Sequence, residues 1–243
     1  MDLTGKIALV AGGAGGIGLG VAKALAAEGC QVALTDRNEG ALLEAAKTAD
    51  TTSPFHCQTC DVTDRKQVAQ LFRWLSGQLG PIDILVNSAG INIAGRMMAD
   101  IDPADFDRVM AVNTTGTFNC IHAALPVMRQ KRSGLIVNIV SLAGKRVMLL
   151  AGMPYCVSKF ATSALGTFVN LEECANGIKV TNIYPGETNT PIIEKRPSPP
   201  PPEKRARMLQ PEDIAACVVA IAKLPPRAVV PELVITPPHM MIA

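Results

Sequence analysis

The sequence predicts a doubly wound α/β fold in which helices cover both faces of a mostly parallel, seven-stranded sheet. Short continuous apolar runs alternate along the chain with segments of helical periodicity, and strands buried on both faces have this composition. The length of 243 residues suits one domain spanning residues 1–243 with one extended core. The predicted strands are residues 6–11, 31–35, 55–60, 82–86, 135–140, 178–183 and 229–235.

Helices are predicted between these strands from apolar periodicity and from signals at their ends. In the first, Ile17, Val21 and Leu25 share one face. A later helix begins at Asp102-Pro103, with an N-cap followed by proline at the first position, and is expected to run towards residue 129. Further helices are expected around residues 42–46 and 68–75, and from about residue 154.

A proline-rich stretch at residues 191–208 interrupts this alternation. Its prolines exclude a regular helix or a central strand. The stretch is either an inert linker or a substrate lid. The lid is favoured because the stretch follows the carboxyl end of a strand, where α/β proteins bind ligands.

The composition excludes several classes of partner. A net charge of +2 gives no field suited to nucleic acid or an anionic membrane, so a small-molecule partner is expected. The apolar run at residues 6–11 is too short for a signal-peptide core and far below the roughly 20 residues that span a bilayer. Seven cysteines, an odd number, do not suit a secreted disulfide framework. A cytoplasmic protein is therefore expected.

The pair Cys57 and Cys60 has the spacing of a zinc or redox motif. No second such pair occurs, and the chain has only three histidines, so ligands for a metal are lacking. Structural thiols and no metal site are predicted.

A glycine-rich turn, residues 11–18, lies between the first predicted strand and helix. Backbone amides and the helix dipole can hold a pyrophosphate there, and side chains would block its approach. A carboxylate about twenty residues further on strengthens this interpretation. Gly12, Gly16, Ile17 and Gly18 are accordingly predicted to bind a dinucleotide.

That carboxylate is Asp36, directly after the second strand. It would accept hydrogen bonds from the adenosine ribose and repel a 2′-phosphate, whereas the adjacent Arg37 would stabilise that phosphate. NAD is therefore favoured over NADP. Asp36 could instead cap the next helix, but Asn38 is better placed for that.

With these motifs in hand, the chain resembles the short-chain dehydrogenase/reductase (SDR) family over essentially its whole length. The glycine turn resembles TGxxxGxG, with Ala11 where threonine is usual, and residues 87–90 resemble NNAG, with Ser88 for the second asparagine. Tyr155 and Lys159 match YxxxK, and residues 185–190 resemble PGxxxT. The resemblance implies a cofactor groove that also includes Asp61, Val62, Asn87, Ala89, Gly90, Pro185, Gly186, Thr188, Thr190 and the Tyr155–Lys159 pair.

The resemblance also implies a catalytic set: Tyr155, Lys159, Ser141 and Asn113. In the family, the tyrosine exchanges a proton with the substrate oxygen, the serine holds that oxygen, and the asparagine holds a water beside the lysine. Tyrosine and lysine four residues apart share one helix face, so the ammonium is expected to lower the phenol pKa from its usual value of ~10.

Most residues expected to border the substrate are apolar, at residues 91–93, 147–153 and 192–193, which favours a ketone or secondary alcohol. Alternatively, a basic rim could bind a carboxylate, coenzyme A or carrier-protein substrate, as in the 3-ketoacyl-thioester reductases of this family. That rim would comprise Lys145, Arg146, Arg196, Lys204 and Arg205.

Two rival functions keep the nucleotide. One is a regulatory protein without catalysis, and the other is epimerisation or dehydration with no net change in the nicotinamide. The intact catalytic set favours oxidoreduction. By resemblance, a homotetramer or homodimer formed through the YxxxK helix is expected.

Overall fold

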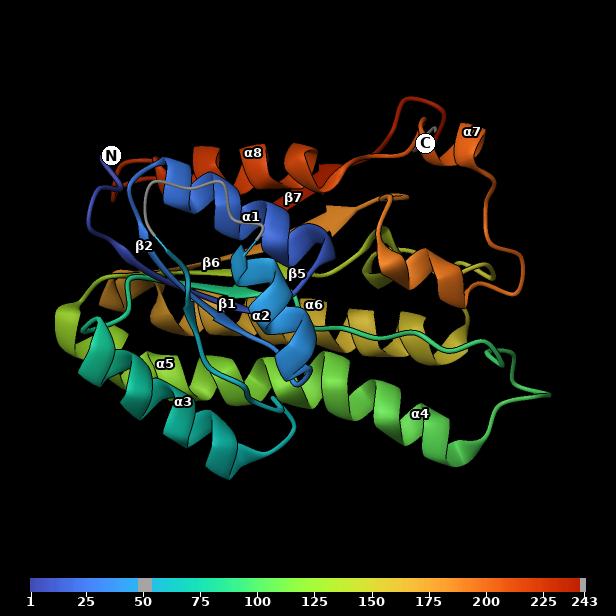
Figure 1. Ribbon diagram of the computed structural model, residues 1–243, viewed down its shortest axis with the longest axis horizontal. Helices are drawn as coiled ribbons and strands as arrows, with labels where there is room; N and C mark the ends of the chain where they lie inside the picture. The colour runs from blue at the N-terminus through green and yellow to red at the C-terminus, as the bar shows by residue number, and fades with distance from the viewer. Residues whose placement is uncertain (48–53, 241–243) are drawn as a thin grey trace.

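The computed structural model describes residues 1–47 and 54–240, and its centre is one sheet in the order β3-β2-β1-β4-β5-β6-β7 (Figure 1). The seven predicted strands are confirmed, and every neighbouring pair is parallel. The third strand, predicted over residues 55–60, has only two residues, and the last strand is shorter than predicted because Pro231, which has no N–H for the ladder, precedes it. The strands are β1 Ile7–Ala11, β2 Gln31–Thr35, β3 His56–Cys57, β4 Ile84–Asn87, β5 Gly134–Ile139, β6 Ile178–Pro185 and β7 Glu232–Ile235.

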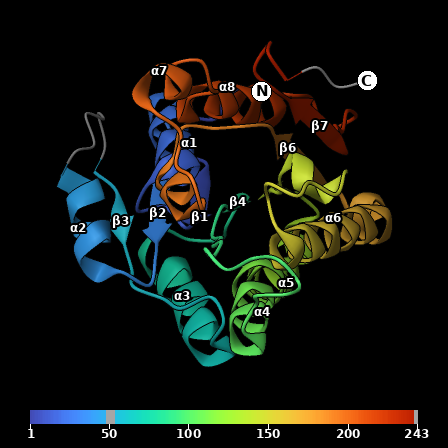
Figure 2. The same cartoon turned by 90° about the vertical axis from the view of Figure 1, so that its right-hand side faces the viewer.

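Helices cover both faces of the sheet, as predicted. Alternate residues of β1 face opposite sides: Ala8 and Val10 pack with α1, α2 and α8, whereas Leu9 packs with α3 and α5. Figure 2 shows α1 and α8 on one side of the sheet and α3, α4, α5 and α6 on the other. The α-helices are α1 Gly16–Ala27, α2 Glu39–Lys47, α3 Arg65–Gln78, α4 Pro103–Met110, α5 Gly116–Lys131, α6 Met153–Glu173, α7 Pro202–Arg205 and α8 Pro211–Ala222.

The helix predicted from Asp102 has three parts. Asp102 caps it by accepting a hydrogen bond from the Ala104 amide at 2.9 Å. Between α4 and α5 the chain forms a π-helical turn, η1 Ala111–Thr115. Such turns are frequent at functional sites, and this one contains Asn113.

The proline-rich stretch contains neither a long helix nor a central strand, as predicted, but it does contain two short helical turns. They are the 3-10 turn η4 Pro191–Lys195 and the single α-turn α7. Each begins with a proline, where a missing N–H removes no helical hydrogen bond. The two ends of the stretch lie next to each other, since the Leu209 amide donates a hydrogen bond to Glu187 O at 3.0 Å. Helix α8, which the sequence analysis did not identify, follows.

A row of three buried asparagines connects the middle of the sheet to α6. Asn87, Asn138 and Asn182 occupy matching positions of β4, β5 and β6. Asn87 Nδ2 donates to Asn138 Oδ1 at 2.9 Å, and Asn138 Nδ2 donates to Asn182 Oδ1 at 3.0 Å. Asn182 Nδ2 then donates to Ser163 O of α6 at 2.9 Å. The row thus fixes the separation between α6 and the sheet.

Gly166 on α6 makes this approach possible. A Cβ there would lie 2.1 Å from Asn182 Oδ1 and 2.6 Å from Asn138 Nδ2. We expect Gly166→Ala to lower the free energy of unfolding by about 2–4 kcal/mol, because it overpacks the interface and breaks buried hydrogen bonds. Chemical denaturation measures this change.

The matched control is Gly77→Ala in α3. Nothing lies within 4 Å of its Cβ position, so alanine should be neutral or stabilise the protein by up to about 1 kcal/mol through helix propensity. Equal unfolding free energies for the two variants would contradict the role given to Gly166.

Candidate active site

A cavity of about 520 Å³ opens at the carboxyl ends of the strands. Strand order reverses between β1 and β4, and parallel α/β sheets bind ligands at such a reversal. The cavity extends from the glycine turn past the ends of β4, β5 and β6 to the proline-rich stretch. It brings together most of the residues predicted from sequence.

The turn before α1 fits the pyrophosphate of a dinucleotide. Helix α1 has Gly15 as its N-cap and no side-chain cap, so its first amides remain available to an anion. No atom lies within 4 Å of the Cβ position of Gly15. Gly12 has φ +77°, and a Cβ there would lie 2.5 Å from the Ala89 amide nitrogen. These features match the Gly-rich cradle that the sequence predicts.

Two predicted cofactor residues, Gly18 and Asn87, do not line the cavity. A Cβ on Gly18 would lie 2.1 Å from Gly12 O, so this glycine lets α1 approach the turn. The Asn87 side chain is buried in the asparagine row. The structure gives both residues a packing role beside the groove. The other predicted cofactor residues line it: Gly12, Gly16, Ile17, Asp36, Arg37, Asp61, Val62, Ala89, Gly90, Tyr155, Lys159, Pro185, Gly186, Thr188 and Thr190.

Asp36 directly follows β2 and, together with Arg37, lines the end of the cavity at which the adenosine of a dinucleotide is predicted to lie. Asn38 Oδ1 accepts a hydrogen bond from the Ala41 amide at 3.1 Å, so Asn38 caps α2. Asp36 Oδ1 accepts a hydrogen bond from the Asn38 amide at 3.1 Å, which orients its carboxylate. The alternative role for Asp36 as a helix cap is thus filled by Asn38.

Tyr155, Ser141 and Lys159 meet at the other end of the cavity. Ser141 follows β5 and lies close enough to the Tyr155 phenol to lower its pKa. Lys159 Nζ lies 5.6 Å from the centre of the Tyr155 ring and donates to Ile139 O at 2.8 Å. The predicted pairing of tyrosine and lysine on one helix face is therefore present.

Burial dominates the proton equilibria of this pair. It raises the pKa of Tyr155 to about 12, and the smaller opposing effects come from the Ser141 hydrogen bond and the charge of Arg196. Burial also lowers the pKa of Lys159 to about 8. The expected net lowering of the phenol pKa does not occur in the cofactor-free chain, because burial is the largest effect on Tyr155. Tyr155 keeps its proton at neutral pH, as a proton donor must.

Asn113 lies behind the cavity wall and does not line it. Its amide pairs with the backbone of Ile91: Oδ1 accepts from Ile91 N at 2.8 Å, and Nδ2 donates to Ile91 O at 3.0 Å. Nδ2 also donates to Ser158 Oγ at 2.9 Å. A Cβ on Gly90 would lie 3.5 Å from Asn113 Oδ1 and 3.6 Å from Lys159 Nζ. Asn113 and Lys159 therefore flank Gly90.

The substrate end is only partly as predicted. Apolar members of all three predicted segments line it, including Ile91, Met148 and Ile192, whereas the side chains of Val147 and Leu149 are exposed. Of the five cations proposed as a basic rim, only Arg196 lines the cavity. Lys145 pairs with Glu232, and Arg205 pairs with Glu194.

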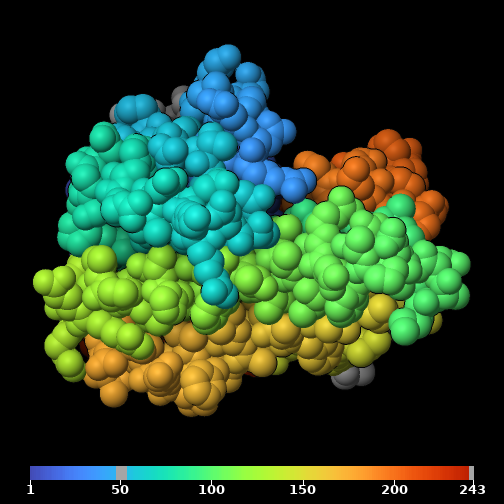
Figure 3. All heavy atoms as spheres, turned by 90° about the horizontal axis from the view of Figure 1, so that it is seen from below, coloured from blue at the N-terminus to red at the C-terminus, as the bar shows by residue number. Residues whose placement is uncertain are grey.

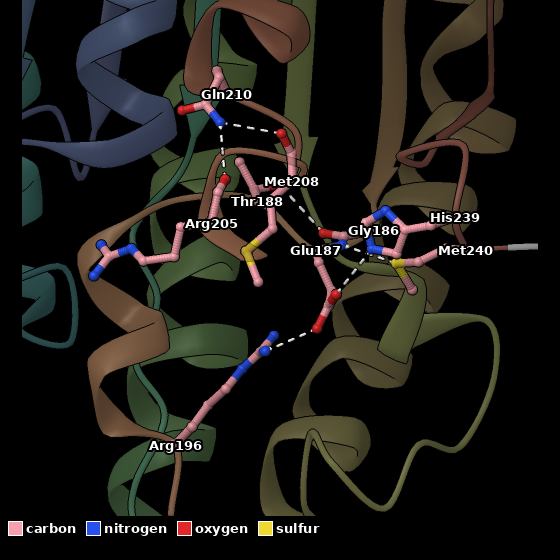
Figure 4. Close-up of polar contacts among 9 residues, drawn as sticks. All are labelled: Gly186, Glu187, Thr188, Arg196, Arg205, Met208, Gln210, His239 and Met240. Atoms are coloured by element: carbon pink, nitrogen blue, oxygen red, sulfur yellow. Dashed lines mark hydrogen bonds and ion pairs between the residues drawn. The ribbon is translucent and has the colours of Figure 1, made fainter. Parts of the chain in front are cut away.

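Sequence reasoning missed three residues of this end: Arg96, Glu187 and Met240. Glu187 belongs to the PGxxxT segment. Figure 4 shows its carboxylate between Arg196, whose Nη1 lies 2.8 Å from Oε1, and His239, whose Nε2 lies 3.4 Å from Oε2. The Glu187 amide also donates to Met240 Sδ at 3.2 Å. The sequence did contain one signal for Glu187, since it is the single charged residue among residues 185–190.

Within residues 1–47 and 54–240, no three His, Cys, Asp or Glu side chains gather as metal ligands would. Cys57 and Cys60 are free thiols, and burial raises the pKa of Cys60 to about 11. No helix in this part of the chain is long and apolar enough to cross a bilayer.

The family is decided by comparison with known proteins. Residues 6–200 match the family model of short chain dehydrogenase. The chain belongs to the SDR family. As an SDR protein it is an NAD(P)-dependent oxidoreductase, which agrees with the cofactor cradle and with the meeting of Tyr155, Ser141 and Lys159.

Individual relatives support this membership. An uncharacterized oxidoreductase of Staphylococcus saprophyticus is 33% identical over 98% of this chain and 99% of its own length. Glycine betaine reductase ATRR of Emericella nidulans is 36% identical over 97% of this chain, which spans only 19% of that protein. The closed form of a serine dehydrogenase complexed with NADP+ superposes with a TM-score of 0.88 at 25% identity, covering 98% of this chain and 97% of the other.

The pKa of Lys159 generates a prediction for cofactor binding. By its family role the ammonium holds the nicotinamide ribose, so the cofactor stabilises the charged form and raises this pKa in the complex. The free chain loses that charge as the pH rises through about 8. NADH affinity should therefore be highest below pH 8 and fall above it, by up to about tenfold per pH unit.

Fluorescence titration between pH 6.5 and 9.5 measures this dependence. Lys159→Met should bind more weakly at low pH and lose the decline above pH 8. A profile that declines equally in both proteins would assign the effect to another group.

Proposed function

We propose that this SDR protein transfers a hydride between a nicotinamide cofactor and a ketone or secondary alcohol, with Tyr155 as the proton donor and acceptor. The observation that carries the proposal is the meeting of Tyr155 with Ser141 and Lys159 in a cavity that continues to the uncapped end of α1. A proton donor and a dinucleotide cradle thus share one space.

In the reducing direction, the bound nicotinamide supplies hydride to the carbonyl carbon. The Ser141 hydroxyl holds the carbonyl oxygen, and Tyr155 delivers its proton as negative charge develops there. Because burial keeps the phenol protonated, it donates readily only to a strongly basic oxygen, such as the alkoxide that forms during hydride transfer. The ammonium of Lys159 stabilises the phenolate left behind. Oxidation follows the reverse path.

The alternatives receive less support. A thioester reductase would need the predicted basic rim, yet Lys145 and Arg205 pair with acids, and Arg196 alone of the five predicted rim cations lines the cavity. A regulatory protein would have no use for Ser141 beside Tyr155. Epimerisation or dehydration would use the same residues, and turnover without net change in nicotinamide absorbance would identify it. The activity in the fungal relative's name belongs to a protein about five times longer than this chain, so we do not transfer its substrate.

Removal of the phenol oxygen tests the mechanism. Tyr155→Phe should lower kcat by at least about a hundredfold, because general acid–base catalysis contributes roughly 10²–10⁴. Its cofactor affinity should stay within about threefold of the unmodified protein, since Phe retains the ring. Nicotinamide absorbance with a panel of ketones and secondary alcohols measures turnover, and fluorescence measures binding. Activity surviving the substitution would refute the assigned donor.

For the cofactor we propose NAD in preference to NADP. Asp36 is free of the capping role and lines the adenosine end, where it would accept from ribose hydroxyls and repel a 2′-phosphate. Arg37 lies beside it and would favour the phosphate, and the serine dehydrogenase that shares this fold was complexed with NADP+. We give Asp36 more weight than Arg37 because Asp36 is the residue that directly follows β2.

The choice is tested by removing the carboxylate. Asp36→Ser should shift the ratio of the NADPH and NADH dissociation constants towards NADPH by about tenfold or more, corresponding to about 1.4 kcal/mol. Glu39→Gln, an exposed acid at the start of α2 that does not line the cavity, is the matched control and should leave the ratio unchanged. Tighter binding of NADPH than of NADH by the unmodified chain would overturn the proposal.

We also infer that residues 191–208 form a substrate lid, because Ile192, Ile193 and Arg196 of this stretch line the cavity.

A second inference is that the chain forms a homodimer or homotetramer through α6. Phe168 and Leu171 of α6 are 67% and 77% exposed, respectively, and Phe118 of α5 is also exposed. Figure 3 shows the surface along which α3, α5 and α6 lie side by side. Self-association would cover these apolar side chains. Light scattering would measure the mass.

A further inference from the structure

The substrate end of the cavity contains more positive than negative charge. Three cations line it, Arg96, Arg196 and Lys159, and Glu187 is the one acid among the described lining residues of this end. The other lining acids, Asp36 and Asp61, belong to the adenosine end. Lys159 is committed to the catalytic pair, so two guanidinium groups face one carboxylate.

Arg96 is a buried cation whose known partners are all neutral. It is 4% exposed, and its guanidinium donates to three carbonyl oxygens, those of Ala94, Leu150 and Lys195. No ion pair within the described part of the chain includes it. Burial, followed by the charge of Arg196, lowers its pKa. Of the five N–H groups of a guanidinium, these bonds use three.

Arg196 lies next to Arg96 in the same wall. Arg96 donates to the carbonyl of Lys195, so the two arginines approach each other through adjacent backbone atoms. Arg196 Nη1 contacts Glu187 at 2.8 Å, and both side chains are largely buried, with 15% and 11% of their surface exposed. The positive charge of Arg196 also reaches the Tyr155 phenol, whose pKa it lowers. Arg196 therefore lies within electrostatic reach of the Tyr155 hydroxyl, and Arg96 lies within electrostatic reach of Arg196.

We infer that Arg96 and Arg196 form a subsite for the carboxylate of a small hydroxy-acid or oxo-acid substrate. The inference rests on the proposed oxidoreduction and names its substrate class. Burying a guanidinium without a counter-charge is unfavourable in free energy. A bound carboxylate would offset much of this desolvation penalty through charge-assisted, bidentate hydrogen bonds. Glu187 serves as the internal anion that holds Arg196 until the substrate carboxylate competes for it. The apolar residues Ile91, Met148 and Ile192 then enclose the carbon skeleton.

A purely structural role for Arg96 is the competing explanation. Its three carbonyl partners lie in the segment after β4, the segment after β5 and the proline-rich stretch, so it also joins three cavity walls. Loss of such a connection would impair all substrates alike. An anion subsite instead discriminates between a carboxylate and a neutral group of the same shape.

The first experiment compares isobutyrate with isobutyramide, which share shape and differ in charge. In the protein saturated with NADH, isobutyrate should raise the melting temperature and isobutyramide should not. Glu187→Gln should bind isobutyrate more tightly, because Arg196 loses its internal partner. Equal shifts for the two compounds, or weaker isobutyrate binding by Glu187→Gln, would overturn the inference. This readout needs no turnover.

The second experiment compares kcat/KM for hydroxy acids of three to five carbons with their methyl esters. The unmodified protein should prefer the acids by at least about tenfold in kcat/KM. Arg196→Gln should lower kcat/KM for the acids by about 10–100-fold, whereas kcat/KM for the esters should change by less than about threefold. Arg205→Gln, in the same proline-rich stretch but outside the cavity, is the matched control and should change neither. Arg96→Lys, which keeps the charge, should retain the acid preference.

The outcomes separate the two proposals. If acids, esters and simple ketones all leave nicotinamide absorbance unchanged, the proposed oxidoreduction fails, while isobutyrate binding still decides the subsite. If esters react as well as acids, or if Arg196→Gln lowers both alike, the subsite fails and oxidoreduction stands. A preference for phosphorylated over carboxylated substrates would also overturn the carboxylate assignment.

Discussion

The close packing of α6 against β5 and β6 determines where Ser141, Tyr155 and Lys159, the proposed catalytic residues, lie. Gly166 lets the helix approach the asparagine row, and Asn182 donates to Ser163 O at the contact. At the amino-terminal half of α6, a Cβ on Gly144 would lie 2.7 Å from Lys159 O, so the segment after Ser141 packs directly on the helix backbone. Ser141 and Tyr155 can lie side by side because Gly144, which has no side chain, lets the segment after β5 pack against the backbone of α6.

This packing also removes water from both titratable groups. Burial acts on the phenol and the ammonium in opposite directions, since it favours the neutral form of each. Tyr155 keeps its proton at high pH, whereas Lys159 approaches neutrality near pH 8. The hydrogen bond from Lys159 to Ile139 O offsets part of the cost of burying the amine. The phenol is thereby kept protonated, as the proposed proton donor requires, and the amine stays beside it at the position proposed to contact the cofactor.

Different constraints govern the two ends of the cavity. The cofactor end consists of strand ends and a helix start, so backbone amides and the shape of the glycine turn define it. The substrate end consists of three segments with little regular structure, and Arg96 and Glu187 connect them through polar contacts. Charged groups that hold walls together are also available to a ligand of opposite charge. In the proposed carboxylate subsite, the same side chains would both connect the cavity walls and select the substrate.

Local sequence was sufficient for the sheet, for the glycine turn with Asp36 and for the Tyr155 and Lys159 pair. Apolar periodicity, glycine conformation and the four-residue spacing on a helix are properties of neighbouring residues, and they need no knowledge of distant contacts. The proline-rich stretch was harder, because prolines that exclude long helices also start short ones.

Only the tertiary structure decided the roles of Asn87, Asn113, Arg96 and Glu187. Asn87 faces the asparagine row instead of the groove because β4 and β5 pair in that register. The partners of Arg96 lie up to 99 residues away along the chain, and no local pattern encodes such contacts. Burial likewise reversed the expected pKa change of Tyr155, since desolvation depends on everything that surrounds a group, whereas spacing along the helix concerns only Lys159.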